Sequence, residues 1–265
     1  MILEKKVQLE RMTTTEVKAA VAESNGIVIL PVGAIEVHGP HLPVGTDSIE
    51  TIEIARRAAV EVGAVLAPPI WYGNSRGFMD FPGTVTLEPE TLRAVIKDVL
   101  MSLIKHGFNK PVILDGHGGN YGMSIIAAED LHLQTGTLVS HVRAWDMATL
   151  SKPKELPTYD GHGGYSETSV MLYLCPEDVD KAQYVDSAPE VEITKYAGAF
   201  PSPSSLYGKG AVTLPLMMGQ MVKIGHHGDP HLATAEQGKG LIEVKTAAVV
   251  EYLQALKANQ IKLRK

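Results

Sequence analysis

The stretch IVILPVGAIEVHGPHLPVGTD, residues 27–47, decides how this chain is interpreted. It begins with β-branched and apolar residues at 27–32, which is the composition of a buried strand. Polar residues follow directly, with Glu36 and His38 close behind the run and Asp47 a few residues further on. These side chains supply N and O donors that suit a divalent metal ion. The stretch therefore predicts a central strand with a metal site at its end.

The spacing of these polar residues supports the metal site. Side chains in a strand repeat every second residue, so Glu36 and His38 point to the same side of an extended segment. One metal ion could then reach both. Asp47 precedes a predicted helix over 48–62, where it could act simply as an N-cap. Because it lies near an upstream Glu and His, we interpret it as a carboxylate able to bridge two cations, whereas His41 is a weaker candidate for a ligand or a substrate contact.

Short β-branched runs alternate with longer amphipathic segments along the chain, which is typical of parallel βα units. Further strands are predicted at 64–68, 111–115 and 138–143. Helices are predicted over 48–62, 88–106, 120–134 and about 232–258. No internal repeat or long linker interrupts this alternation. Residues 1–265 are therefore predicted to form a single layered α/β/α domain with a mostly parallel central sheet.

A second polar motif, DGHGGN at 115–120, directly follows the predicted strand 111–115. Its glycines flank His117 and let the backbone come close to a metal ion or a substrate. Asn120 begins the next helix, whose first free N–H groups could face a developing negative charge. We predict a metal ligand at His117 and substrate contacts at Gly118 and Asn120. Ligands in open α/β sheets bind outside the carboxyl ends of strands, so this motif should meet the first one there.

A third polar motif, GHGGYSETS at 161–169, combines His162 with Glu167. Glu167 falls in the first turn of a predicted apolar helix, where a carboxylate is worth about 0.3–1 kcal/mol on its own. That effect explains Glu167 without a metal ion, but it does not explain His162. Both residues are therefore candidates for the site.

The remaining histidines are weaker candidates. His226, His227 and His231 lie in GHHGDPH, a glycine- and proline-containing loop that could be an exposed turn or a set of ligands. Three others lie in helical or strand patterns and are interpreted as structural, namely His106, His132 and His141.

Composition excludes several classes of protein. The net charge of −6 and the pI near 5.9 argue against nucleic acid or an anionic membrane as a partner, because both require clustered Lys and Arg. Cys175 is the only cysteine, so no internal disulfide can form. No apolar stretch of about 18 residues and no signal peptide is recognised. We expect a cytoplasmic protein that acts on a small molecule.

Two irregular regions are predicted to border the site. The loop WYGNSRGFMDFPGTVT at 71–86 mixes aromatic residues with Arg76 and is interpreted as facing the substrate, although an ordinary omega loop would have similar residues. Residues 185–231 contain many prolines and glycines. Loops of that length in a compact domain tend to be lids or subunit contacts.

The motifs together resemble those of one known family. PVGAIEVHGPHLPVGTD, FPGTVTL, DGHGGN, Trp145-Asp146, GHGGYSETS and GDPHLATAEQG are similar to segments of the creatininase (creatinine amidohydrolase) family over about residues 27–255. The resemblance implies a layered α/β fold, a homohexamer and a binuclear site for zinc, manganese or iron. The family also contains formamide deformylases, a peptide-trimming member and a sugar-ring hydrolase.

The resemblance also implies a division of the ligands between two ions. One ion would be held by Glu36, Asp47 and His117, and the other by His38 and the shared Asp47. Creatininase has a glutamate two residues after the histidine of the motif that matches DGHGGN, where this chain has Gly119. Glu167 is then the replacement ligand. Two divalent ions per subunit are expected, with zinc favoured over manganese or iron.

The substrate side departs from creatininase. His162 matches a histidine near the substrate, but the glutamate that precedes it in creatininase is Gly161 here. One aromatic substrate contact is retained as Trp145, and the other aligns with Tyr159. Arg76 completes the predicted substrate contacts. The altered pocket argues against creatinine as the substrate.

The leading interpretation is a binuclear metal-dependent amidohydrolase that cleaves a non-peptide C–N bond of a small molecule, a cyclic amide or a formamide. A hydroxide that the metal ions generate near neutral pH would attack the carbonyl carbon. His162 would pass a proton to the leaving nitrogen, and Glu167 is the second predicted catalytic residue. The alternatives are hydrolytic opening of a keto-sugar, keto-inositol or lactone ring, and a metal-stabilised binding protein without turnover.

Overall fold

The computed structural model describes residues 6–151, 160–187 and 216–259. At its centre lies a four-stranded sheet in the order β2-β1-β3-β4, in which every neighbouring pair is parallel. The strands are β1 (Ile27–Val32), β2 (Val65–Leu66), β3 (Lys110–Asp115) and β4 (Ser140–Arg143). β2 is shorter than predicted because Pro68 and Pro69 follow it and have no N–H to donate to a neighbouring strand.

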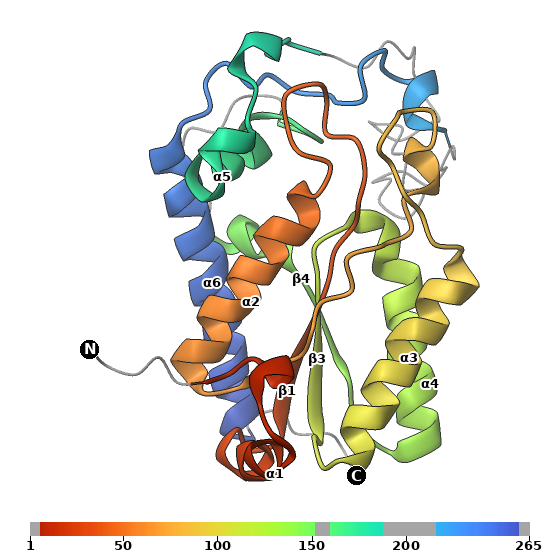
Figure 1. The fold of residues 1–265 in the computed structure, drawn as a ribbon, viewed down its shortest axis with the longest axis vertical. Coiled ribbons are helices and arrows are strands. Elements are labelled where there is room, and N and C mark those ends of the chain that lie inside the picture. The colour runs from red at the N-terminus through yellow and green to blue at the C-terminus, as the bar shows by residue number, and fades with distance from the viewer. Residues whose placement is uncertain (1–5, 152–159, 188–215, 260–265) are drawn as a thin grey trace.

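Helices cover both faces of the sheet, as Figure 1 shows. On one face lie α2 (Thr46–Val62), α5 (Tyr165–Leu174) and α6 (Ala235–Lys257). On the other lie α3 (Pro89–Lys105) and α4 (Tyr121–Thr135). The predicted layered α/β/α architecture with a parallel sheet is confirmed.

The core is divided by the alternation of side chains along β1. Ile27 and Ile29 pack in the cluster that contains residues of α2, α5 and α6. Val28 and Leu30 pack in the cluster that contains residues of α3 and α4. All four side chains are fully buried, and each contributes roughly 1.5–3 kcal/mol through burial. A strand buried on both faces needs an unbroken apolar run, which is why 27–32 has no polar residue.

The helix boundaries follow from local signals. α2 ends at Gly63, which adopts a left-handed conformation with φ of 70°. α3 begins with Pro89 in its first turn and ends shortly before Gly107. α1 (Thr14–Glu23) was not predicted, although Thr13 and Glu16 form a capping box at its start. None of its residues is fully buried, so it lacks a strong apolar pattern. Within the described ranges, no helix is both long and apolar enough to cross a membrane.

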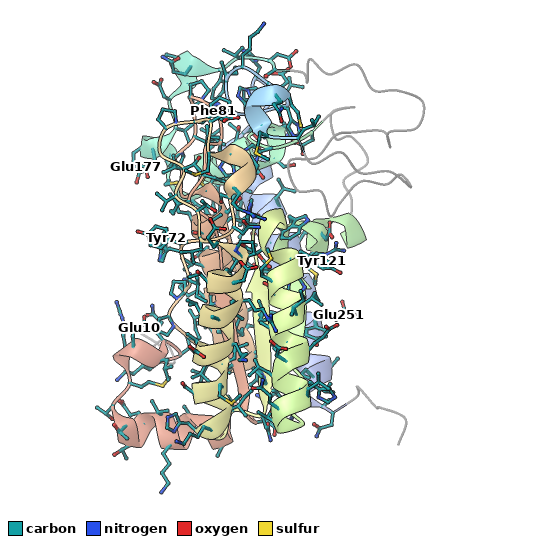
Figure 2. The ribbon with its side chains drawn as sticks, turned by 90° about the vertical axis from the view of Figure 1, so that its right-hand side faces the viewer. Glu10, Tyr72, Phe81, Tyr121, Glu177 and Glu251 are labelled. Atoms are coloured by element: carbon teal, nitrogen blue, oxygen red, sulfur yellow. The ribbon has the colours of Figure 1, made fainter. Side chains whose placement is uncertain are left out.

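The strand order places the candidate site. From the central β1 the chain moves to one side to form β2 and then to the other side to form β3. The reversal occurs at the carboxyl ends of β1 and β3, which is where open α/β sheets bind their ligands. The loop 71–86 extends toward the same end of the molecule, from Tyr72 at mid-height in Figure 2 to Phe81 near the top, whereas Glu10 lies in the lower half. The sheet therefore directs the polar motifs to one end.

Candidate metal centre

The structure brings the predicted ligands together at the carboxyl ends of β1 and β3. Two sets of three side chains have ligand atoms within 4.8 Å of one another. We call Glu36, Asp47 and His117 the inner group, and His38, Asp47 and Glu167 the outer group. Asp47 belongs to both groups. A third set joins Glu36 and His38 to His162.

Glu36 and His38 reach the centre because the segment after β1 stays extended. Val37, between them, points the other way and packs with Phe78 and with residues of the 216–222 segment. The Val37 backbone N–H also donates to Thr84 Oγ1 at 3.1 Å. This is the predicted alternation, with the two polar side chains on one side and the apolar one on the other.

Asp47 does not cap α2. The helix begins at Thr46 with Gly45 as its N-cap, so Asp47 is inside the first turn. Its side chain turns into the centre, with Oδ1 at 3.1 Å from His38 Nε2 and Oδ2 at 3.1 Å from His117 Nδ1. One carboxylate oxygen thus faces each group, which is the geometry of a bridging ligand.

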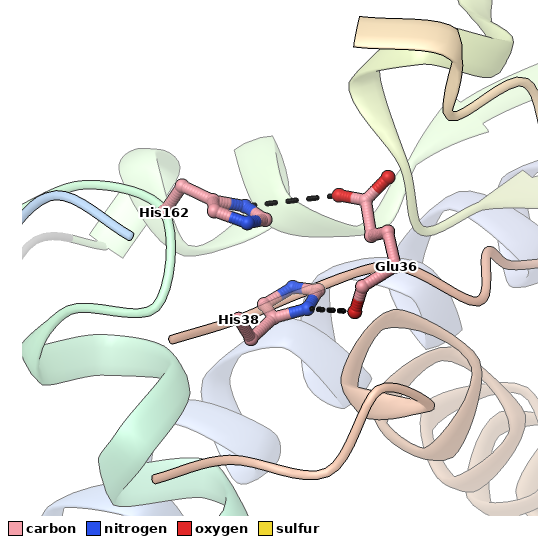
Figure 3. A group of neighbouring side chains, drawn as sticks. All are labelled: Glu36, His38 and His162. Atoms are coloured by element: carbon pink, nitrogen blue, oxygen red, sulfur yellow. Dashed lines mark hydrogen bonds and ion pairs between the residues drawn. The ribbon is translucent and has the colours of Figure 1, made fainter. Parts of the chain in front are cut away.

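Three histidines of the centre place one ring nitrogen against a main-chain carbonyl oxygen. The pairs are His38 Nδ1 with Glu36 O at 3.1 Å, His117 Nε2 with Asn74 O at 3.1 Å, and His162 Nε2 with Val37 O at 2.6 Å. Figure 3 shows the first of these. A carbonyl oxygen can only accept, so the nitrogen that faces it carries the proton.

The second nitrogen of each ring faces a carboxylate of the centre. His38 Nε2 and His117 Nδ1 face Asp47, and His162 Nδ1 lies 3.7 Å from Glu36 Oε1 (Figure 3). Metal-binding histidines nearly always donate their other N–H to a carbonyl or carboxylate, which fixes the tautomer. The rings are therefore oriented as ligands would be.

The pKa shifts of the histidines show that the carboxylates of the centre stabilise positive charge. Burial opposes the protonation of His38, yet Asp47 and Glu167 outweigh it and raise the pKa of His38 to about 10. Burial likewise opposes protonation of His117, but Glu36 and Asp47 raise its pKa to about 9. Burial raises the pKa of Glu36 and that of Glu167 to about 7. Without a metal ion, protons on the histidines balance the carboxylates, and divalent ions would displace those protons.

The carboxylate oxygens provide a test of whether metal ions fit. Both carboxylate oxygens of Glu36 and Oδ2 of Asp47 are buried, and none accepts a geometrically defined hydrogen bond from the described residues. The His117 ring lies within ion-pair distance of Glu36 Oε2 and Asp47 Oδ2, at 3.2 and 3.1 Å. Leaving a buried charged oxygen without a partner is costly. A divalent ion in each group would satisfy these oxygens, and the N and O donors suit zinc, manganese or iron. The residues fit a pair of divalent ions.

Glu167 lies at the start of α5 and also faces the centre. Its Oε2 accepts the N–H of Gly163 at 2.6 Å and lies 3.6 Å from His38 Nε2. The favourable first-turn position and the position in the outer group are therefore compatible. Its side chain is 28% exposed, against 0% for His38 and 9% for Asp47, so it is the accessible member of the outer group.

His162 forms the wall of the centre opposite Glu36 (Figure 3). Its ring centroid lies 4.2 Å from that of His38 and 4.6 Å from that of Phe78. Burial, together with His38, keeps the pKa of His162 well below its usual range, so the ring is neutral. A neutral ring with its proton on Nε2 has a lone pair on Nδ1 that can accept a proton.

Asp115 organises the turn that carries His117, a role that the sequence analysis did not assign. Its buried carboxylate accepts hydrogen bonds from the His117 backbone N–H, Asn120 Nδ2, Ser124 Oγ and His141 Nε2, at 2.9–3.2 Å. The only available signal was a charged residue at the end of the apolar strand β3. The interpretation of His141 as structural agrees with this contact.

Phe78 and Asn74 are the other contributors that the sequence analysis did not name as site residues. The Phe78 ring packs 6.0 Å from that of His117, and Asn74 supplies the carbonyl oxygen that accepts from the same ring. Both belong to the loop 71–86, which was predicted to face the substrate. An apolar ring and a main-chain oxygen give no chemical signal in a sequence.

The predicted substrate residues lie in different environments. Arg76 is exposed, and Gly118 starts the one-turn helix η3 (Gly118–Asn120). Trp145 is half-buried in η4 (Ala144–Ser151), directly after β4. Tyr159 lies outside the described residues. The Asn120 amide donates to Gly33 O and to Asp115 Oδ1 and accepts from the Asn74 N–H, so both of its N–H groups are used within the protein.

The loop GHHGDPH reaches the neighbourhood of the centre. The ring of His227 lies 6.3 Å from that of His162, and the buried ring of His226 lies 4.9 Å from that of His41. His41 is also buried, with Nε2 at 3.0 Å from Gly163 O. His231 is exposed and pairs with a nearby aspartate. Of the predicted irregular excursion, the described part at 216–231 contains no α-helix and no strand.

Comparison with known proteins identifies the family. A family model described as creatinine amidohydrolase matches residues 10–253. The chain belongs to the creatininase family. The match spans every element that contributes to the inner and outer groups.

Relatives within the creatininase family carry different names. The chain is 32% identical to creatinine amidohydrolase of Pseudomonas putida, over 71% of this chain and 79% of the relative. It is 33% identical to a mycofactocin precursor peptide peptidase of Mycolicibacterium smegmatis, over 80% and 78%. It is 28% identical to 3-dehydro-scyllo-inosose hydrolase of Thermotoga maritima, over 94% and 82%. The protein is therefore an enzyme, a hydrolase of the creatininase family, and the alternative of a binding protein without turnover is set aside.

Solved creatininase structures agree with the fold. The structure described as creatininase Mn superposes with a TM-score of 0.78 at 25% identity, covering 94% of this chain and 98% of that chain. A mutant creatininase of the Zn-Zn type gives a TM-score of 0.76 at 26% identity, with the same coverage. Creatininases thus bind manganese or zinc, and the described residues of this chain form clusters that could hold such ions.

Proposed function

We propose that this protein hydrolyses a non-peptide C–N bond of a small molecule, a cyclic amide or a formamide, at a centre that holds two divalent ions. The inner group would hold one ion and the outer group the other. The observation that carries the proposal is the position of Asp47, whose two oxygens face different histidines at 3.1 Å each. Zinc is the favoured metal, with manganese or iron as alternatives.

The bound ions would supply a water molecule of lowered pKa and a Lewis acid for the substrate oxygen. The chain's own residues prepare and complete that chemistry. The main-chain carbonyls of Glu36 and Asn74 hold the His38 and His117 rings in the tautomers that ligands need. The Phe78 ring closes one side of the centre and limits the access of bulk water there.

His162 is proposed to handle the proton. Its neutral ring donates through Nε2 to Val37 O and keeps Nδ1 available beside Glu36. Nδ1 would take a proton from the attacking water and return it to the leaving nitrogen. Glu167, as the accessible carboxylate of the outer group, would act together with His162 as the second catalytic residue. Trp145, Arg76, Gly118, Asn120 and Tyr159 remain the proposed substrate contacts.

The experiment is a screen of the metal-reconstituted enzyme. Cyclic amides including creatinine, N-formyl amines, short peptides and keto-inositols are incubated with the zinc-, manganese- and iron-loaded protein, and the products are identified by mass spectrometry. We expect addition of one water to a cyclic amide, or release of formate from a formamide, and this reaction should be lost on chelation and restored by metal. Turnover that survives complete metal removal would overturn the proposal.

A second candidate is hydrolytic ring opening of a keto-inositol or related keto-sugar. It is favoured by the similarity to the inosose hydrolase, which extends over 94% of this chain. Its product is a keto-inositol that has gained one water although the substrate contains no nitrogen, so the same screen separates the two candidates. A homohexamer is proposed from the family resemblance, and light scattering of the purified protein tests it.

A further inference from the structure

Arg76 has an unusual environment for an arginine of this protein. Most arginines of the described ranges are paired with a carboxylate, as in Arg56 and Arg57 with Glu53, Arg93 with Asp130, and Arg143 with Asp146. Arg76 is exposed and forms no ion pair with the residues that the structure describes, and its guanidinium donates a hydrogen bond to the Asn74 side chain. The charge of Arg76 is therefore available to a ligand.

The Arg76 side chain is nevertheless held in place. Its Nε donates to Asn74 Oδ1 at 3.1 Å. The Asn74 amide in turn donates to Gly119 O at 3.0 Å, and its backbone oxygen accepts from His117 Nε2 at 3.1 Å. Arg76 is thus connected through a single residue to a member of the inner group. Since Nε is occupied, the two terminal nitrogens remain for binding.

The one-turn helix η2 (Arg76–Phe78) places Arg76 at the rim of the centre. Its other end, Phe78, is buried and packs against the rings of His117 and His162, at 6.0 and 4.6 Å between centroids. Arg76, two residues away, is on the solvent side of the same turn. Arg76 therefore lies on the outer side of a turn whose other end packs against the rings of the centre.

The charge of the loaded centre is compatible with an anion. Glu36, Asp47 and Glu167 provide three negative charges, and two divalent ions would provide four positive charges. With neutral histidines, one positive charge remains while the bound water is protonated, and none remains when it is a hydroxide. Arg76 adds a positive charge in either state, so an anionic ligand would be attracted in spite of the net charge of −6 of the whole chain.

We propose that Arg76 binds an oxyanion, a carboxylate or a phosphate, on the part of the substrate remote from the scissile C–N bond. The proposal rests on the function proposed above and narrows its substrates to anionic amides. A guanidinium whose Nε is already anchored presents its remaining N–H groups as a planar fork, which matches the two oxygens of such a group.

Hydroxamate probes test this without knowledge of the substrate. The monohydroxamates of succinic, glutaric and adipic acid have a metal-chelating hydroxamate at one end and a carboxylate at the other, separated by three different chain lengths. Butyro-, pentano- and hexanohydroxamic acid are the uncharged partners of matching length, and 3-phosphonopropanohydroxamic acid replaces the carboxylate by a phosphonate. Binding to the zinc-loaded protein is measured by calorimetry.

We expect at least one anionic probe to bind about tenfold more tightly than its uncharged partner, which is the size of effect that one charge-assisted pair provides. Arg76→Gln should remove this preference and leave the affinity for the uncharged probe unchanged. Arg76→Lys should retain part of this preference.

Arg11→Gln is the matched control. Arg11 is also exposed and forms no ion pair among the described residues, but it follows Glu10, which lies in the lower half of the molecule in Figure 2, far from Phe81. The phosphonate probe separates a phosphate ligand from a carboxylate ligand.

The inference is overturned if charged and uncharged probes bind equally at every length, or if the preference persists in Arg76→Gln. Failure of the proposed function has a different signature, in which no hydroxamate binds and the protein takes up no zinc by elemental analysis. In that case the inference about Arg76 falls with the metal centre on which it depends.

Discussion

The inner and outer groups share Asp47 but differ in how the fold supports them. In the inner group, the side chains of Glu36, Asp47 and His117 are 1%, 9% and 6% exposed, and they come from the ends of β1 and β3 and the start of α2. In the outer group, Glu167 is 28% exposed and comes from α5, outside the sheet. A ligand that is buried and attached to the sheet has little freedom to move away. The inner ion should therefore exchange slowly and the outer ion faster.

The largest effect is expected from Asp47→Ala, which removes the ligand common to both groups. Both ions should be lost, and turnover should fall on the order of ten-thousandfold or more, because the activated water depends on them. Elemental analysis and steady-state assays measure the two losses. Asp98→Asn, an exposed acid on α3, is the control and should change neither. Retention of two ions by Asp47→Ala would contradict the shared-ligand arrangement.

His162→Asn tests whether the third set of side chains holds a metal ion. If His162 handles protons, turnover should fall roughly a hundredfold to ten-thousandfold, the usual contribution of a general acid–base group. Metal content should stay at the wild-type value. Loss of one equivalent of metal in this variant would instead make His162 a ligand. The set of Glu36, His38 and His162 would then have to be treated as a third metal-binding group.

Glu167→Gln tests the outer group alone. We expect one ion to be retained and the other to bind at least about tenfold more weakly, since a charged ligand is replaced by a neutral one. Stepwise removal from the wild type by a chelator should release one equivalent before the second. Release of both equivalents together, at one chelator concentration, would show that burial does not distinguish the groups.

Asp115→Asn should give the smallest effect and should act on the inner group only. Asp115 contacts no predicted ligand ring, but it holds the His117 backbone N–H and Asn120 in place. Changes to such supporting residues typically cost about 10–100-fold in metal affinity or activity, and we expect the lower end of this range because Asp115 contacts the His117 main chain and not its ring. Titration with zinc should show weaker inner binding and unchanged outer binding. Equal weakening of both groups would indicate general damage to the fold.

The sheet and most of the inner group could be predicted from the sequence for local reasons. A short apolar run rich in β-branched residues is typical of a strand buried on both faces. Glu36 and His38 follow the end of β1 within six residues, so they stay near its carboxyl end. His117 follows β3 in the same way. Parallel strands then bring both motifs to one edge of the sheet, so three-dimensional proximity follows from short distances along the chain.

The outer group and the walls of the centre could not be predicted in this way. Glu167 meets His38 across 129 residues, and the first turn of a helix is a favourable position for a glutamate even without a metal ion. Only the family resemblance suggested it as a ligand. Phe78 and the Asn74 oxygen contribute through packing and through the main chain, neither of which has a sequence pattern. α1 was missed because its apolar side chains are only partly buried.

The carbonyl oxygens that orient His38, His117 and His162 all belong to the main chain. Every amino acid has this oxygen, so no single codon change can delete these acceptors. Scanning mutagenesis would therefore overlook the groups that set the protonation pattern of the centre. Substitutions can therefore change the side chains that contact a substrate, while the backbone continues to fix the orientation of these three imidazole rings. This gives a physical reason why one scaffold can serve relatives with such different names.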